Sequence, residues 1–201
     1  MKSPLILAST SRHRAGLLGR LGMPFAVESP GVDEARLPGE PPHALAARLA
    51  RAKAQDVASR HTGAWVLGSD QVAVREGEIL GKPLDAARCE AQLLGSSGRE
   101  VAFLTAVCLA RAGSGACFEH LDNTQVRFRA LSAAEVRRYV ELERPLDCAG
   151  GFRCEGLGIA LFERIESVDP TALIGLPLIW VAQALRDVGL DPLGSRVVSR
   201  E

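Results

Sequence analysis

The sequence lacks the features that would place the protein in a membrane, outside the cell or on nucleic acid. No apolar run approaches the roughly 20 residues that a membrane-spanning helix needs. The formal net charge is zero, so no broad electrostatic attraction to nucleic acid is indicated. Residues 1–4 lead straight into the strand-like residues 5–7, without the apolar core of a secretory signal peptide. We therefore expect a cytoplasmic protein that binds neither membranes nor nucleic acid.

The cysteines also lack a pattern that is typical of disulfide scaffolds or zinc sites. There are five of them, an odd number, and no two are spaced as Cys-x-x-Cys. We interpret Cys148 and Cys154 as reduced core residues rather than as a redox pair.

No internal repeat, low-complexity linker or clear domain boundary is present. The chain has 201 residues, of which 47% are apolar, enough to bury a sizeable core. We expect a single domain over residues 1–201, with two lobes about one cleft and a frayed tail over residues 191–201.

Residues 68–83, GSDQVAVREGEILGKP, are the stretch around which the site is predicted to form. Apolar residues on both sides place the carboxylate of Asp70 within strand-like sequence. The Glu-Gly-Glu sequence at 76–78 predicts a tight turn that would bring Lys82 back towards Asp70. A carboxylate and an ammonium group at one rim suit an anionic substrate and a metal ion. An ordinary hairpin with a surface lysine remains the alternative.

The first strand also leads into a candidate anion site. Residues 5–8 read as a buried strand that continues through Ser9 and Ser11 into a helix containing Arg14. Such a junction directs unpaired backbone N–H groups and the positive end of the helix dipole at one point. Because a cation in the first turn opposes this dipole, we interpret Arg14 as the partner of a ligand phosphate. The alternative is that Ser11 only caps the helix and Arg14 is solvated.

Charged residues in and before the next helix are further candidates. Residues 43–60 form the clearest helix, and Lys53 falls on its apolar face, where its ammonium must reach solvent or meet an anion. Asp56 is the simplest partner. In the loop that precedes the helix, Asp33 and Glu34 are adjacent carboxylates of the kind that holds a hard metal ion, although such pairs are usually just solvated.

Four glycines surround Glu155 between residues 148 and 158. They predict a backbone that bends tightly or approaches a ligand closely, and a glycine-rich turn with an exposed glutamate is the alternative. Elsewhere, patterning predicts strands over residues 25–28, 100–110, 117–129 and 159–162. Helices are predicted after the capping residues Asp85 and Ser132 and from near Pro177.

Taken in order, these motifs resemble the Maf family of nucleoside triphosphate pyrophosphatases across nearly the whole chain. The motifs are Leu7 to Arg14, Val32-Asp33-Glu34, Lys53-Ala54, Gly68-Ser69-Asp70-Gln71, Gly81-Lys82-Pro83, Ala149-Gly150 with Glu155-Gly156-Leu157-Gly158, and Gly175-Leu176-Pro177. Ser69-Asp70-Gln71 resembles the subgroup acting on 7-methyl-GTP, whereas the subgroup acting on dTTP and UTP carries Ala-Asp-Thr there. The resemblance implies an α/β fold with an elongated mixed sheet flanked by helices and a central cleft, like that of inosine triphosphate pyrophosphatases. It also implies a divalent metal, Mg²⁺ or Mn²⁺, and a homodimer.

The resemblance further implies hydrolysis of 7-methyl-GTP to the monophosphate and pyrophosphate, a house-cleaning reaction against modified nucleotides. Asp70 would be the general base and would share the metal ion with Glu34. The phosphates would be bound by Ser9, Ser11, Arg14, Lys53 and Lys82, and the base by His13, Gln71 and Glu155. His13 stands where this subgroup has an aromatic residue, and a histidine can still stack on a purine. The alternatives are a dTTP- or UTP-type enzyme and a non-catalytic nucleotide-binding regulator of septum formation.

Overall fold

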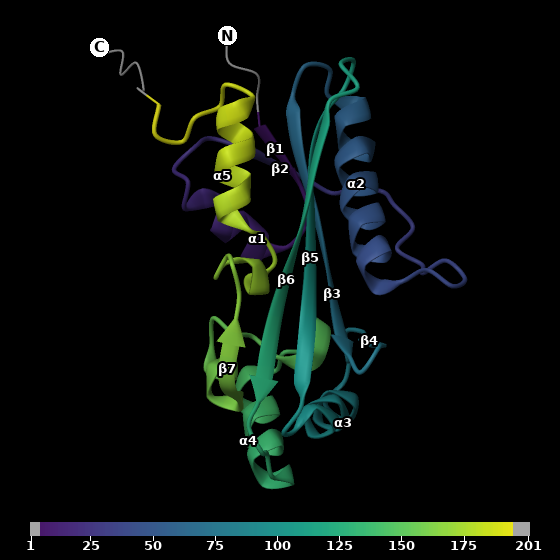
Figure 1. The fold of residues 1–201 in the computed structure, drawn as a ribbon, viewed down its shortest axis with the longest axis vertical. Coiled ribbons are helices and arrows are strands. Elements are labelled where there is room, and N and C mark those ends of the chain that lie inside the picture. Colours follow the sequence, from purple (N-terminus) through teal and green to yellow (C-terminus); the bar gives the residue numbers. More distant parts are fainter. Residues whose placement is uncertain (1–4, 195–201) are drawn as a thin grey trace.

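The computed structural model describes residues 5–194, which form a seven-stranded mixed β-sheet flanked by helices (Figure 1). The strands are β1 (Leu5–Ala8), β2 (Ala26–Glu28), β3 (Trp65–Arg75), β4 (Glu78–Leu80), β5 (Glu100–Arg111), β6 (Cys117–Phe128) and β7 (Phe162–Glu166). The α-helices are α1 (Arg12–Gly19), α2 (Pro42–Arg60), α3 (Ala86–Ser96), α4 (Ala133–Glu143) and α5 (Leu178–Asp187). Short 3₁₀ helices are η1 (Ala149–Gly151), η2 (Leu157–Leu161) and η3 (Ala172–Ile174).

The strand order of the sheet is β2-β1-β3-β5-β6-β7, and β4 pairs with β3 beside this series. β1 is parallel to β2 and β3, and the remaining pairs are antiparallel. The predicted class, an α/β fold with an elongated mixed sheet flanked by helices, is therefore confirmed. None of the helices within residues 5–194 is long and apolar enough to cross a membrane.

Helices cover both faces of the central strand β3, which explains why most of its residues are buried. Figure 1 shows α2 on one side of the sheet and α1 and α5 on the other. On the α2 side, a Cβ atom added to Gly68 would lie 2.3 Å from the carbonyl oxygen of Ala50. The α2 backbone thus approaches β3 as closely as only glycine permits. This approach fixes where α2 can direct its side chains.

Two large hydrophobic clusters lie along β3. Trp65 and Leu67, at the start of the strand, belong to a cluster with α1 and α5, whereas Ala73 belongs to a cluster beneath α3 and α4. In the second cluster Phe103 and Phe152 pack edge to face with ring centroids 5.1 Å apart. The stretch of β3 between the two clusters contains Asp70. The prediction of one domain with two lobes stays a prediction.

Most predicted boundaries agree with the structure because they depend on local chemistry. The turn between β3 and β4 has positive φ at Glu76 and Gly77, Asp85 caps α3, and Ser132 caps α4 through a capping box with Glu135. These helix starts and this turn are confirmed.

The strand predicted over residues 159–162 is wrong, since residues 157–161 form η2 and β7 begins only at Phe162. A Cβ atom at Gly158 would lie 2.2 Å from the Arg153 carbonyl oxygen, so the chain folds back tightly here. A short apolar run does not by itself distinguish a strand from a helical turn. Within the predicted frayed tail, residues 191–194 contain a turn in which the backbone N–H of Gly194 donates to the Asp191 carbonyl oxygen, and the fraying itself stays a prediction. The rest of that tail lies outside the described residues.

Candidate functional site

The predicted site residues converge on one cleft of about 1030 Å³. Asp33, the other acid proposed beside Glu34, does not line it and instead accepts from the Ala35 backbone N–H. All the other residues proposed for the site do line it, namely Ser9, Ser11, His13, Arg14, Glu34, Lys53, Asp70, Gln71, Lys82 and Glu155. They come from the β1–α1 junction, the loop before α2, α2 itself, β3, the segment after β4 and the segment before η2. Elements far apart in the sequence therefore supply one cavity of a size that suits a nucleotide.

The centre of the cleft holds a lysine between two carboxylates. Lys53 Nζ lies 2.6 Å from Asp70 Oδ1 and 2.6 Å from Glu34 Oε1. Lys53 and Asp70 are buried, whereas the Glu34 side chain is 57% exposed. Asp56, the partner that helix spacing favoured, instead accepts hydrogen bonds from the Gly31 backbone and from Arg60. The prediction that Lys53 points inward is confirmed, and the prediction that Asp56 is its partner is wrong.

Electrostatic coupling extends this centre to Arg14. The hydrogen bond from Lys53 lowers the pKa of Glu34, with further lowering by the charges of Lys53, Lys82 and Arg14 and an opposing effect of burial. Burial lowers the pKa of the Arg14 guanidinium, and the charges of Asp70 and Glu34 oppose that effect. The acids and bases of the cleft thus influence one another, as groups that share one site do.

Glu34 and Asp70 are suitably placed to hold a hard divalent cation. Each places one carboxylate oxygen against the Lys53 ammonium, whose positive charge occupies the point where a metal ion would be held. Carboxylate oxygens are the ligands of Mg²⁺, which commonly takes one or two of them and completes its shell with water and substrate phosphates. Among residues 5–194 no third metal-ligating side chain joins these two closely. The pair therefore fits a metal ion that is shared with a bound triphosphate.

The β1–α1 junction is tied to the segment before α5. Ser11 caps α1 by accepting from the Arg14 backbone N–H at 3.4 Å, and Ser9 Oγ accepts from the Ser11 N–H at 3.1 Å. Arg14 Nε donates to the Gly175 carbonyl oxygen at 3.0 Å, and Ser69 Oγ donates to the same oxygen at 2.9 Å. Ser11 thus caps α1 and also lines the cleft, and Arg14 is half-buried and bonded rather than solvated, as the alternative required.

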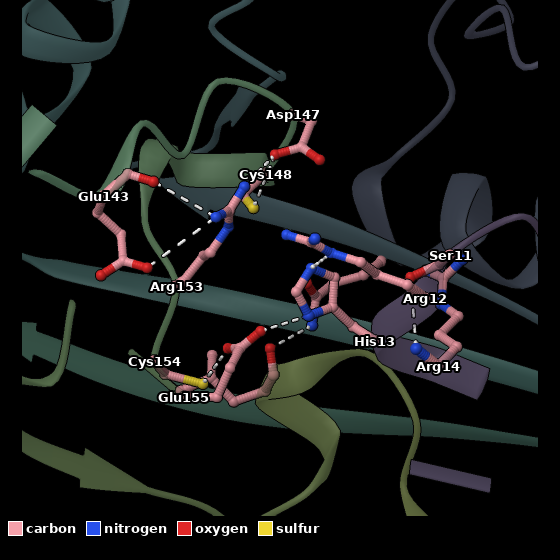
Figure 2. Close-up of polar contacts among 12 residues, drawn as sticks. Ser11, Arg12, His13, Arg14, Glu143, Asp147, Cys148, Arg153, Cys154 and Glu155 are labelled. Atoms are coloured by element: carbon pink, nitrogen blue, oxygen red, sulfur yellow. Dashed lines mark hydrogen bonds and ion pairs between the residues drawn. The ribbon is translucent and has the colours of Figure 1, made fainter. Parts of the chain in front are cut away.

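At another part of the cleft, His13 meets Glu155 (Figure 2). His13 Nδ1 lies 2.6 Å from Glu155 Oε1. Two glycines near Glu155 allow other parts of the chain to pack closely against the backbone. Gly158 packs on the Arg153 carbonyl oxygen, and a Cβ atom at Gly156 would lie 2.7 Å from the Glu143 carboxylate. The bent backbone that the sequence predicted is present, and it presents Glu155 to a residue from the first helix.

Gln71 is held in place by its side-chain amide nitrogen. Nε2 donates to Thr105 Oγ1 at 2.9 Å and to the carbonyl oxygens of Ala172 and Leu173, each at 3.1 Å. Since carbonyl oxygens only accept, these contacts identify the nitrogen end of the amide. A ligand in the cleft would therefore meet Gln71 through Oε1.

Further charged residues in the cleft were not predicted from the sequence. Arg153 lines it together with Asp147 and Cys148, and Figure 2 shows Arg153 Nη2 directed at Asp147 Oδ1, 2.9 Å away. Arg12 lines the cleft as well. The available signal was a lone cation two positions before Glu155 in the glycine-rich segment, since arginine is well suited to bind carboxylates and phosphates.

Comparison with known proteins shows the family to which the chain belongs. A family model described as Maf-like protein matches residues 4–188. The chain is 54% identical to the 7-methyl-GTP pyrophosphatase of Xanthomonas oryzae pv. oryzae (strain KACC10331 / KXO85), covering 94% of this chain and 98% of that protein. It is 51% identical to that of Ralstonia nicotianae (94% and 97% covered) and 47% identical to that of Pseudomonas syringae pv. tomato (93% and 97% covered).

Among solved structures, the Ham1 protein of Staphylococcus aureus aligns with a TM-score of 0.46 and 13% identity, over 63% of this chain and 72% of that one. With a family model matched over nearly its whole length and relatives at about half identity, the chain belongs to the Maf family.

Proposed function

We propose that this protein hydrolyses 7-methyl-GTP between its α and β phosphates, giving 7-methyl-GMP and pyrophosphate. The observation that carries the proposal is the convergence of two pairs on one cleft: Lys53 with Asp70, and His13 with Glu155. The first pair offers a base and a cation to a phosphate, and the second offers a carboxylate and an aromatic ring to a purine. Maf relatives 47–55% identical to this chain are named 7-methyl-GTP pyrophosphatase, which supports the choice of substrate.

Asp70 is the proposed general base. Its position within β3 and its contact with Lys53 restrain the carboxylate, so that one oxygen is held while the other accepts a proton from the attacking water. The bond between the α-phosphorus and the bridging oxygen then breaks, and pyrophosphate leaves. A buried carboxylate on a rigid strand suits this role because its geometry is set before the substrate arrives.

Charge that develops on the leaving pyrophosphate is neutralised by Arg14, Lys53 and Lys82. All three line the cleft, and each is within electrostatic reach of Glu34. Ser9 and Ser11 place hydroxyl groups beside the start of α1, where backbone N–H groups favour anions. These residues are proposed to bind the phosphate chain.

We also propose that Glu34 and Asp70 hold Mg²⁺ or Mn²⁺ together with the substrate phosphates. When bound, the ion polarises phosphate oxygens and offsets their charge. Lys53 would then have to release at least one carboxylate, and its freed ammonium would be available to a substrate phosphate in the same cleft. The two carboxylates therefore do not need to move far to exchange one cation for another.

Base recognition is proposed for His13, Gln71 and Glu155. Methylation at N7 gives guanine a positive charge, which a nearby carboxylate stabilises, and Glu155 also accepts hydrogen bonds from purine N–H groups. His13 orients Glu155 through the Nδ1 contact and presents an aromatic face to the base. A homodimer in the cytoplasm is proposed as well, and size-exclusion chromatography with light scattering tests the dimer.

A pyrophosphate-release assay tests the function. The purified chain is assayed with 7-methyl-GTP, GTP, dTTP and UTP in the presence of Mg²⁺, Mn²⁺ or Co²⁺. We expect 7-methyl-GTP to give the highest kcat/KM and Asp70→Asn to lower kcat at least about 100-fold. Asp187→Asn on α5, outside the cleft, is the matched control and should leave kcat unchanged.

Three results would overturn parts of this proposal. Near-normal turnover by Asp70→Asn would remove the assignment of the base. A preference for dTTP or UTP would place the chain with the other kind of Maf enzyme. Absence of pyrophosphate release with every nucleotide and metal would favour a nucleotide-binding regulator without catalysis.

A further inference from the structure

A pair of thiols lies outside the cleft, on the hairpin of β5 and β6. Cys108 Sγ and Cys117 Sγ are 2.9 Å apart. In the sheet register Cys108 is opposite Glu119 and Ala110 is opposite Cys117, so the two cysteines are diagonal neighbours on adjacent strands. The twist of a β-sheet can bring diagonally placed side chains on the same face into contact. A disulfide needs about 2.0 Å between its sulfur atoms, so they would have to approach by less than about 1 Å.

The two thiols differ in accessibility. Cys117 is exposed, whereas Cys108 is fully buried beneath α2. Burial, followed by the contact with Cys117, raises the pKa of the Cys108 thiol, so Cys108 does not compete for an oxidant in solution. The Cys117 thiol can therefore react with a solute, and the buried Cys108 thiol lies next to it. This is the arrangement of an attacked cysteine and a resolving cysteine.

A cation adjoins the pair. Arg51 on α2 binds the Glu119 carboxylate with two nitrogen atoms, and Cys117 Sγ lies 3.6 Å from Glu119 Oε1. Cys117, Glu119 and Arg51 therefore form one chain of contacts from the hairpin to α2.

A thiophilic metal ion is the rival occupant. The ligand atoms of Cys108, Cys117 and Glu119 all lie within 4.8 Å of one another. However, Glu119 is already bound by Arg51, and a dication there would face this guanidinium. A disulfide is neutral and leaves the ion pair of Arg51 and Glu119 intact. The charges therefore favour oxidation over metal binding.

We propose that Cys108 and Cys117 form a reversible disulfide when the protein meets a hydroperoxide. The peroxide oxidises Cys117 to a sulfenic acid and is reduced to an alcohol, or to water if it is hydrogen peroxide. Cys108 sulfur then attacks the Cys117 sulfur, the S–O bond breaks, and the hydroxyl group leaves as water with the Cys108 proton. The two thiols lose two electrons and two protons in total, and the peroxide accepts them. A dithiol reductant reverses the reaction.

The disulfide would join β5 to β6 close to the point where α2 is bound. It would close the turn between the strands and restrain Glu119, which Arg51 ties to the helix that also carries Lys53. Closing a loop of this short length stabilises the folded chain mainly by restricting the unfolded one. We expect the oxidised protein to unfold about 5 °C above the reduced protein.

Mass spectrometry tests the proposal on the full chain. The reduced protein is treated with hydrogen peroxide at neutral pH, its remaining thiols are blocked with N-ethylmaleimide, and it is weighed intact and after trypsin cleavage. We expect three of the five cysteines to be labelled. Trypsin should release residues 100–111 joined to residues 112–127, and dithiothreitol should separate them. The Tm should rise on oxidation.

Cys117→Ser and the double variant Cys148→Ser/Cys154→Ser are the controls. Cys117→Ser should form no linked peptide and show no rise in Tm, and its exposed position makes misfolding no obstacle. The double variant should still form the linked peptide. The proposal is overturned if peroxide leaves both thiols labelled, pairs other cysteines, or converts Cys117 to a sulfinic acid while Cys108 stays free. It is also overturned if native mass spectrometry finds a zinc ion that protects Cys108 and Cys117 from labelling.

Discussion

Lys53 Nζ on α2 lies 2.6 Å from Asp70 Oδ1 on β3, and both side chains are buried. Removing two charges from water is costly, and their attraction repays the cost only when each keeps its partner. The same lysine also contacts Glu34 at 2.6 Å, so one ammonium serves two acids. Stability and the proposed chemistry therefore depend on the same three groups.

Lys53→Met should destabilise the protein and impair turnover. Methionine fills similar space but leaves the buried Asp70 carboxylate without its ammonium partner, which costs about 3 kcal/mol in the free energy of unfolding. Urea unfolding measures this loss. The double variant Lys53→Met/Asp70→Asn removes both charges and should recover at least half of it, while pyrophosphate release stays low. Simple addition of the two single losses would contradict the coupling.

Glu155→Gln should reduce selectivity for the methylated base. The substitution keeps the shape of the side chain near His13 and removes the charge that favours N7-methylguanine. We expect the ratio of kcat/KM for 7-methyl-GTP to that for GTP to fall about 10-fold, the size of one charge-assisted contact. Glu163→Gln on β7, outside the cleft, is the control. An unchanged ratio in Glu155→Gln would remove Glu155 from base recognition.

Features set by neighbouring residues were predictable from the sequence. The capping residues Asp85 and Ser132 and the turn at Gly77 follow from local backbone chemistry. The inward position of Lys53 follows from its place on the apolar face of α2, and the family followed from the order of short motifs. The roles assigned to the site residues stay predictions, although the structure places all of these residues at one cleft.

Contacts between distant segments were not predictable in the same way. Helix spacing favoured Asp56 for Lys53, whereas the real partner, Asp70, depends on how closely α2 packs on β3 at Gly68. The contact of Cys108 with Cys117 depends on strand register and twist, and cysteine spacing carries no signature of it. Patterns report which face a residue takes, and only packing determines what that face meets.

The loop that carries Glu34 should respond to acid through Glu40. Arg48 donates two hydrogen bonds to the Glu40 carboxylate, at 2.6 and 2.9 Å, and a third to the Ala35 carbonyl beside Glu34. The hydrogen bond with Arg48 lowers the pKa of Glu40 to about 2. Since the pKa of Glu40 is lower in the folded state than in the unfolded state, its ionised carboxylate stabilises the folded protein. This stabilisation is complete above about pH 4.5 and is lost as the pH falls towards 2.

Glu40→Gln removes this titration. The Tm of the variant should lie below that of the wild type at pH 6, and the gap should narrow by about half at pH 3. Thermal unfolding of both proteins at pH 6, 4.5 and 3 measures the difference between their Tm values. The other acids that titrate in this range are present in both proteins, so their effects on Tm cancel in this difference. A gap that stays constant down to pH 3 would show that the Glu40 carboxylate is not held as the structure indicates.

Gly68→Ala should push α2 away from β3 and so displace Lys53 in the cleft. The added Cβ would lie 2.3 Å from the Ala50 carbonyl oxygen and 2.6 Å from the Ala54 nitrogen, so the helix must move away from β3. We expect a loss of about 2–3 kcal/mol in the free energy of unfolding and a kcat at least about 10-fold lower, because Lys53 moves with the helix. Gly16→Ala on α1 is the control: its Cβ meets nothing within 4 Å, so kcat should be unchanged and stability should rise by up to about 1 kcal/mol. Equal effects of the two substitutions on turnover would show that the packing of α2 on β3 does not position Lys53.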